Sequence, residues 1–128
     1  MPKTTVLIFA ETDGTAPLLN WMDDLPSKVQ DKCIVKIERL EEMGYELHRP
    51  EADLLRNGIH ELRIAFRSIQ YRILYFFYGQ EAILSHGLIK ESEVPDKDIE
   101  IALKRMEMFK LNPQLHTYEE KHHENKQK

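Results

Sequence analysis

The sequence has the length and composition of a single globular domain. Its 128 residues are enough to bury a core, and contents of 41% hydrophobic and 31% charged residues exclude a disordered or fibrous chain. The formal net charge of -4 argues against a protein that binds nucleic acid over its whole surface.

The charge is distributed unevenly along the chain. Residues 1–53 hold 6 Lys and Arg against 11 Asp and Glu, a net charge of -5, whereas residues 54–110 hold 9 against 8, a net charge of +1. Residues 111–128 hold 3 of each sign. Any basic surface must therefore be local.

The cysteine content and the apolar runs bear on the compartment. Cys33 is the single cysteine of the sequence, so no intramolecular disulfide can form, which is typical of a reducing cytoplasm. No stretch approaches the ~20 apolar residues that cross a bilayer, and the apolar run near the N-terminus is too short for a secretory signal. We expect a cytoplasmic protein that does not enter the membrane.

The first half of the chain predicts one strand and two helices. Residues 4–11, "TTVLIFAE", are β-branched and apolar and end in a turn, which indicates a strand. Residues 16–25 and 27–44 predict helices, the second with Val29, Cys33, Ile37 and Leu40 on one apolar stripe. Residues 45–58 are expected to form a polar connection with an Asn57-Gly58 turn signal.

The second half predicts three strands and a helix. The strands span residues 59–67, 70–78 and 81–90, and Gly79 suits a two-residue hairpin of type II′. Residues 96–110 follow as a helix. The order β-α-α-β-β-β-α indicates an α+β domain over residues 1–112, a small antiparallel-rich sheet with helices on one face. Residues 113–128 are expected to be a flexible polar tail.

Arginines recur along the strand pair "HELRIAFRSIQYRILYFFYG", residues 60–79. If residue 67 lies opposite residue 70, the apolar and aromatic side chains share one face, which we expect to meet the helices. Arg63 and Arg72 then lie diagonal to each other on the second face, within reach of one ligand. The first face would comprise His60, Leu62, Ile64, Phe66, Tyr71, Ile73, Tyr75 and Phe77, and the second Glu61, Arg63, Ala65, Arg67, Arg72, Leu74 and Phe76.

Two interpretations of the arginine face are open at this point. The planar, always-charged guanidinium suits phosphate oxygens and can stack on a base. Charged residues that alternate with apolar ones are also usual in any half-exposed antiparallel strand. A hairpin link longer by one residue would spoil the alignment, so the register is itself a hypothesis.

A series of short motifs occurs between residues 54 and 109 in a defined order. They are Leu55-Arg56-Asn57-Gly58, Glu61-Leu62-Arg63, Tyr71-Arg72-Ile73-Leu74-Tyr75, His86-Gly87-Leu88-Ile89-Lys90-Glu91, Pro95 and Ile99-Glu100-Ile101-Ala102. In this order they resemble the phage-derived HigB-like branch of the RelE/ParE toxin superfamily. The close resemblance covers just under half of the chain.

The resemblance implies the toxin of a type II toxin–antitoxin pair. Such a protein is a metal-independent and cofactor-free endoribonuclease that cuts mRNA, usually in the ribosome. Its partners would be mRNA, the ribosome and a cognate antitoxin, often with a helix-turn-helix, and it could form a homodimer or a toxin–antitoxin hetero-oligomer. The 2′-hydroxyl of the RNA would attack the adjacent phosphate, so the protein must position the RNA and neutralise developing charge.

The resemblance also implies roles for single residues. Arg63 and Arg72 would contact the scissile phosphate or its neighbours, Lys90 would add charge stabilisation, and His86 would serve as acid or base. Further RNA contacts would come from Arg56, Tyr71 and Tyr78. Arg67 lies outside the matched motifs, beside the turn, and would add a supporting contact at best.

Some of these residues could instead have a purely structural role. The expected register puts His86 opposite Ile73 on the core side, where a packed, hydrogen-bonded histidine is the alternative. For Tyr71 and Tyr78 the alternative is an ordinary buried strand aromatic. His116, His122 and His123 could bind a metal or simply lie in a polar tail, and Cys33 suits the core.

The sequence departs from the family pattern next to Lys90. Glu91 stands where the second lysine of a pair is expected, Leu88 replaces a phenylalanine, and residues 91–98 are acidic. Carboxylates beside a phosphate site repel RNA, so activity could be weak, dependent on the ribosome, or lost. The alternatives to an mRNA-cutting toxin are a non-catalytic binding or regulatory module with the same fold, and a ParE-like inhibitor of DNA gyrase.

Overall fold

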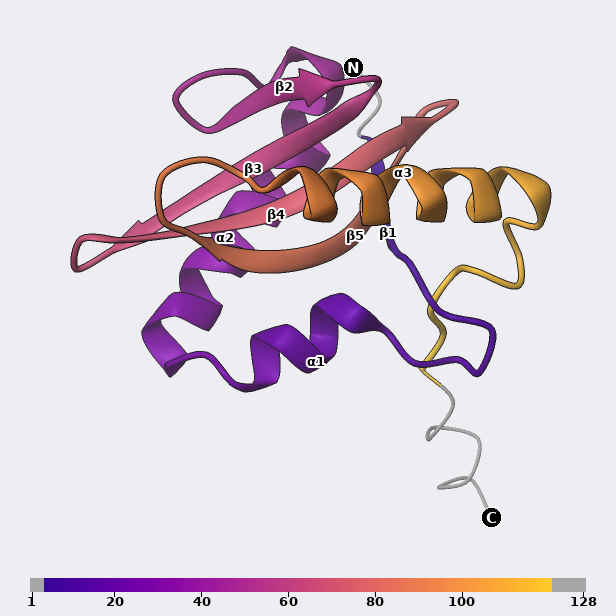
Figure 1. The fold of residues 1–128 in the computed structure, drawn as a ribbon, viewed down its shortest axis with the longest axis horizontal. Coiled ribbons are helices and arrows are strands. Elements are labelled where there is room, and N and C mark those ends of the chain that lie inside the picture. The colour runs from indigo at the N-terminus through magenta and orange to yellow at the C-terminus, as the bar shows by residue number, and fades with distance from the viewer. Residues whose placement is uncertain (1–3, 121–128) are drawn as a thin grey trace.

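A computed structural model describes residues 4–120 of the chain as a five-stranded sheet with three helices (Figure 1). The α+β class is confirmed, and none of the helices in this part of the chain is long and apolar enough to cross a membrane. The sheet order is β1-β5-β4-β3-β2, with β1 parallel to β5 and the other pairs antiparallel. The elements are β1 (Thr5–Ile8), α1 (Pro17–Asp23), α2 (Ser27–Met43), the short 3₁₀ helix η1 (Gly44–Glu46), β2 (Ala52–Arg56), β3 (Ile59–Phe66), β4 (Ile69–Tyr78), β5 (Glu81–Lys90) and α3 (Asp96–Leu111).

The helices cover both faces of the sheet, which differs from the predicted single covered face. Leu18 of α1 and Val29 and Leu40 of α2 pack with Leu62 and Tyr75 on one face. A second apolar cluster joins α3 to the opposite face and contains Leu74, Phe76, Ile83, Ile99, Ala102 and Phe109. Because β4 is the middle strand, its residues from Tyr71 to Phe76 are all buried. We name the side that carries α3 the α3 face.

The β3–β4 hairpin has a two-residue turn, as predicted, but the turn lies one residue earlier in the chain. Phe66 pairs with Ile69, and the two-residue turn consists of Arg67 and Ser68, both at positive φ (52° and 69°), the pattern of a type I′ turn. The register therefore differs by two residues from the expected pairing of 67 with 70. A shift of two leaves every side chain on its predicted face, but it brings Arg63 directly opposite Arg72 instead of diagonal to it.

The β4–β5 hairpin begins as predicted and then changes register. Gly79, at φ 60°, and Gln80 form the two-residue link, and Tyr75 pairs with Leu84. A bulge follows, because Leu74 pairs with His86 and leaves Ser85 as the extra residue. The prediction that His86 lies opposite Ile73 on the core side of α1 and α2 is therefore wrong, and His86 faces α3.

The polar connection of residues 45–58 contains a strand that the sequence analysis missed. β2 pairs with β3 across the Asn57-Gly58 turn, so the predicted turn signal is correct. β2 is an edge strand with polar residues, and its bulge near Leu54 interrupts the regular pairing.

Part of the expected tail is packed against the sheet. The Tyr118 N–H donates to the Ile8 carbonyl at 2.8 Å, and Thr117 forms an isolated antiparallel β-bridge with Phe9. The His116 ring is buried and stacks on Phe9 with centroids 5.1 Å apart. Residues 113–120 therefore extend the fold beyond the predicted boundary at 112, and the metal hypothesis for His122 and His123 falls outside the described residues.

The glycine of the His86-Gly87 motif is explained by packing. A Cβ at Gly87 would overlap the ring of Trp21 from α1, the helix that covers this part of β5. We expect Gly87→Ala to lower the free energy of unfolding by about 1–3 kcal/mol, because overpacking displaces the indole. Chemical denaturation measures the effect. In a Trp21→Leu background the same change should cost much less, and equal costs in both backgrounds would contradict the contact.

Candidate functional site

The arginines of β3 and β4 are joined by a carboxylate on the α3 face. Arg63 lies opposite Arg72, and Glu61 precedes Arg63 by two residues on the same face. The Arg63 Nε donates to Glu61 Oε2 at 2.8 Å, and the Arg72 Nε donates to Glu61 Oε1 at 3.0 Å. Each oxygen of the carboxylate thus holds one guanidinium. The cluster Arg63–Glu61–Arg72, which we name the arginine cluster, carries a net charge of +1.

The two guanidinium groups differ in their exposure to solvent. The side chain of Arg72 is 4% exposed, and its Nη1 also donates to the Tyr71 carbonyl at 2.9 Å. Burial lowers the pKa of Arg72 from its ordinary value, while Glu61 opposes that shift. The side chain of Arg63 is 28% exposed. Arg63 is therefore the member of the cluster that a ligand can reach.

Lys90 adds a second reachable cation to the same face. It pairs with Gln70 at the end of β5, and Gln70 precedes Arg72 by two residues on β4. Lys90 is half-buried, and within residues 4–120 its side chain makes no hydrogen bond or ion pair. Its ammonium therefore has donors to spare at the end of the sheet where the arginine cluster lies.

Acidic residues surround these cations. Asp53 of β2 accepts from Arg63 Nη2 at 3.4 Å and pairs with Arg49 Nη2 at 2.8 Å, and the Arg49 hydrogen bond lowers the pKa of Asp53. Arg56 pairs across to α3, with Glu100 at 3.1 Å and Asp96 at 3.6 Å. Much of the local basic charge is therefore neutralised within the protein.

His86 holds α3 on the sheet instead of facing solvent. Its Nδ1 is 2.8 Å from Ser85 Oγ, and its Nε2 is 3.0 Å from Asp98 Oδ1 of α3. Arg105 Nη1 donates to the same Ser85 hydroxyl at 3.4 Å. The histidine is 8% exposed and both ring nitrogens have partners, so this geometry favours the alternative of a packed, hydrogen-bonded residue.

The remaining predicted contacts are dispersed. Tyr71 is 3% exposed and packs edge-on against Trp21 on the face opposite the arginines, so its ring is covered. Tyr78 lies at the far end of β4 against Phe109. Arg67, at the β3–β4 turn, is exposed and places its guanidinium 5.1 Å from the centroid of the Phe66 ring. The structure thus groups Arg63, Arg72 and Lys90, and leaves both tyrosines away from them.

Two groups in this region were not singled out from the sequence. Glu61 was placed on the correct face but given no role, although an acidic residue two positions before Arg63 on the same face is a signal for an ion pair. The Ser85–Asp98 pairing with His86 depends on the bulge and on the position of α3, and neither was predicted.

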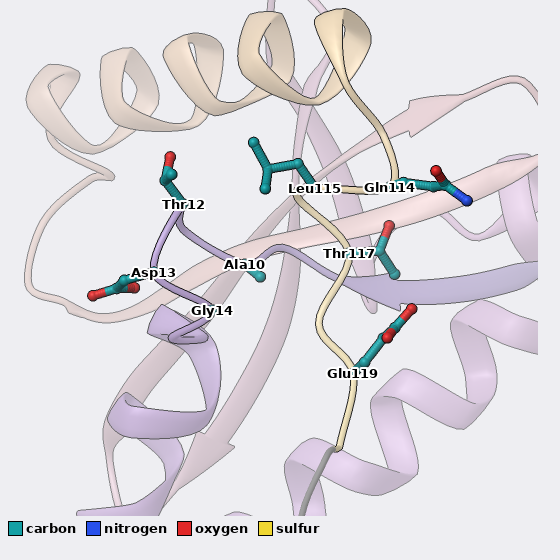
Figure 2. A pocket seen from close by; sticks show the side chains of 8 residues that line it. All are labelled: Ala10, Thr12, Asp13, Gly14, Gln114, Leu115, Thr117 and Glu119. Atoms are coloured by element: carbon teal, nitrogen blue, oxygen red, sulfur yellow. The ribbon is translucent and has the colours of Figure 1, made fainter.

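A separate pocket lies between the β1–α1 loop and the packed C-terminal segment (Figure 2). It has a volume of about 200 Å³ and presents Asp13 and Glu119 together with hydroxyl and amide groups. Of residues 4–120, no Lys or Arg lines it, and the carboxylates of Asp13 and Glu119 would repel a phosphate. Among residues 4–120, no group of three His, Cys, Asp or Glu side chains is arranged to hold a metal ion.

Comparison with known proteins identifies one family. A family model described as "Phage derived protein Gp49-like (DUF891)" matches residues 20–107. The match is longer than half of the chain and runs from α1 into α3, so it includes the arginine cluster, His86 and Lys90. No curated protein matches the sequence.

The buried His86 predicts a pH dependence of stability. Burial lowers the pKa of His86 below 6.5, and the nearby Arg105 acts in the same direction, while Asp98 opposes them. As the pH falls below 6.5, His86 binds a proton more readily in the unfolded chain than in the folded one. The free energy of unfolding should therefore fall as the pH drops from 7.5 to 5.5. Each such histidine contributes a slope of at most about 1.4 kcal/mol per pH unit.

Denaturation of the wild type and His86→Gln across this range measures the contribution. The slope should become shallower in the variant without vanishing, because burial also lowers the pKa of His60. An unchanged slope would contradict the neutral, buried state of His86.

Proposed function

The chain belongs to the phage-derived Gp49-like family, and on this premise we propose that it is the toxin of a type II toxin–antitoxin pair and cuts mRNA. The observation that carries the proposal is the grouping of Arg63, Arg72 and Lys90 at one end of the α3 face. The β3–β4 hairpin extends past the N-terminal end of α3, so the tip of this face has no helix over it (Figure 1). An RNA strand could approach there.

The chemistry that fits this site is transfer of the phosphate to the neighbouring ribose oxygen. The 2′-oxygen forms a bond to phosphorus, the bond from phosphorus to the 5′-oxygen breaks, and a 2′,3′-cyclic phosphate remains. The proton of the 2′-hydroxyl is lost to a base and the leaving 5′-oxygen gains one. Fixed cations lower the barrier by stabilising the negative charge that gathers on the phosphate oxygens. Arg63 and Lys90 supply such cations.

In this proposal the ribosome, and not the protein itself, supplies most of the affinity for mRNA. The arginine cluster has a net charge of +1, Asp53 lies 3.4 Å from Arg63, and the exposed Glu91 follows Lys90 in the sequence. Such a site attracts a polyanion weakly, because like charges oppose the phosphates. A ribosome that holds the mRNA in place would remove the need for strong binding by the protein itself.

The other predicted contacts have smaller parts in this proposal. Arg67 is exposed at the hairpin tip without a carboxylate partner within residues 4–120, so it suits a phosphate next to the scissile one. Arg56 ties β2 to α3 and supports the site indirectly. His86 has both nitrogens engaged, so a role as acid or base would require Asp98 or Ser85 to release it.

The proposed partner is an antitoxin, often a helix-turn-helix protein in such pairs. The resemblance to toxins, together with family membership, supports a reading frame for this partner next to the gene. Its co-expression should prevent any growth arrest that the toxin causes.

A second candidate function is a non-catalytic binding module with the same fold. It is favoured by the arginine cluster itself, because both guanidinium groups already donate to Glu61. The two candidates differ in one measurable respect, which is cleavage of mRNA in the presence of ribosomes.

Inducible expression with mapping of mRNA ends tests the proposed function. The wild type should arrest growth and cut mRNA in phase with codons, whereas Arg63→Ala should reduce cleavage about 10²-fold or more, as a loss of charge stabilisation does. Arg72→Ala should also reduce cleavage, because it removes the buried partner of Glu61. Lys90→Ala should weaken cleavage as well. Lys28→Ala removes an exposed cation from α2, on the other side of the sheet, and should have no effect. A wild type that cuts no mRNA with ribosomes present would contradict the enzymatic proposal.

A further inference from the structure

We infer that Glu61 is a positioning residue that aims the guanidinium of Arg63 at the RNA phosphate, and that Arg72 acts through Glu61 without touching the RNA. This inference rests on the proposed function. In this arrangement Arg63 contacts the RNA phosphate, and Arg72 keeps Glu61 in position.

The hydrogen bonds of Arg63 fix the direction of its free donors. Nε donates to Glu61 at 2.8 Å, and Nη2 lies 3.4 Å from Asp53. These two nitrogens form one edge of the planar guanidinium, and the carboxylates occupy that edge. Nη1 has no partner within residues 4–120. A phosphate oxygen can therefore accept from Nη1 while Glu61 keeps the plane from rotating.

Arg72 is placed to hold Glu61 and is poorly placed to meet RNA. Its Nε binds the second oxygen of Glu61, and its Nη1 binds the Tyr71 carbonyl and lies 3.4 Å from Gln70 Oε1. These contacts, with an exposure of 4%, fix the guanidinium inside the protein. Because Glu61 and Arg63 alone would be neutral, the positive charge of Arg72 also leaves the cluster attractive to an anion.

The geometry argues against an alternative in which Glu61 is an inhibitory anion that RNA displaces. The carboxylate is 3% exposed and belongs to a strand that is paired on both sides at this position. A phosphate could take its place only by breaking both hydrogen bonds and entering beside the buried Arg72, which is 4% exposed. Glu61 is therefore part of the frame of the site.

Glu61→Gln distinguishes a positioning role of Glu61 from a simple effect of its negative charge, because the two predict opposite changes in RNA binding and cleavage. Removal of a negative charge near a phosphate site should strengthen RNA binding if charge alone matters. The positioning role predicts the opposite, because an amide has one acceptor oxygen and its NH₂ group opposes an arginine N–H. We expect ribosome-dependent cleavage to fall at least tenfold, and affinity for a short single-stranded RNA oligonucleotide to fall or stay constant.

Glu91→Gln is the matched control. It removes one exposed negative charge beside Lys90 and leaves the arginine cluster intact. It should leave cleavage unchanged or raise it, and should strengthen oligonucleotide binding slightly.

A spectroscopic readout reports the position of Arg63 without RNA. The Nε–H signal of Arg63 in a ¹⁵N-labelled protein should be resolved and protected in the wild type, and should lose protection in both Glu61→Gln and Arg72→Gln. If the single change at Glu61 prevents folding, the double variant Glu61→Gln and Arg72→Gln removes the buried pair together and leaves no lone buried charge. It should fold, lack the protected signal and lack cleavage.

The outcomes distinguish the inference from the proposed function. Glu61→Gln protein that cleaves like the wild type or binds RNA more tightly, while the wild type is active, overturns the inference alone. A wild type that neither cleaves mRNA on ribosomes nor binds the oligonucleotide overturns the proposed function and, with it, the inference.

Discussion

The central constraint on this structure is that the middle strand of the sheet, β4, is buried at every residue from Tyr71 to Phe76. An apolar strand meets this condition at no cost, but β4 carries Arg72 in its middle. A charge in that position must be paired within the protein, because an isolated buried ion is far less stable than one in water. Glu61 on the neighbouring strand supplies the pairing, and the position of Arg63 follows because Glu61 accepts from both arginines.

The same constraint separates the structural from the solvent-facing part of the site. Inside the sheet, Arg72, Glu61 and the hydrogen-bonded His86 are buried and have partners. On the solvent-facing side of the site, Arg63 and Lys90 keep donors that nothing in residues 4–120 uses. A phosphate can approach the second group without disturbing the first, which allows a rigid frame to hold a small number of reactive contacts.

The alternation of side chains in residues 60–79 predicted the two faces of the hairpin correctly, because a period of two depends only on the strands being extended. The exact pairing was not predictable in this way. The turn uses Arg67 and Ser68 at positive φ, without the glycine or asparagine that normally indicates such a turn. The bulge at Ser85 likewise has no local signal, and it moved His86 to the α3 face. β2 could have been found, since an Asn57-Gly58 turn implies a strand on each side.

The motifs that resemble those of a toxin family contain two kinds of residue. Some are needed for packing or charge pairing, and others keep hydrogen-bond donors unused within residues 4–120. Gly87 is required by the ring of Trp21, and Leu74 and Tyr75 by the two cores, so these positions would persist in a relative with no activity. Arg72 and Glu61 also satisfy a structural need, because each neutralises the other inside the sheet. The presence of the motifs therefore identifies the fold and the family more firmly than the chemistry. In the proposed function, activity would depend on Arg63 and Lys90, which keep donors unused within residues 4–120, and these are the positions where an active and an inactive relative should differ.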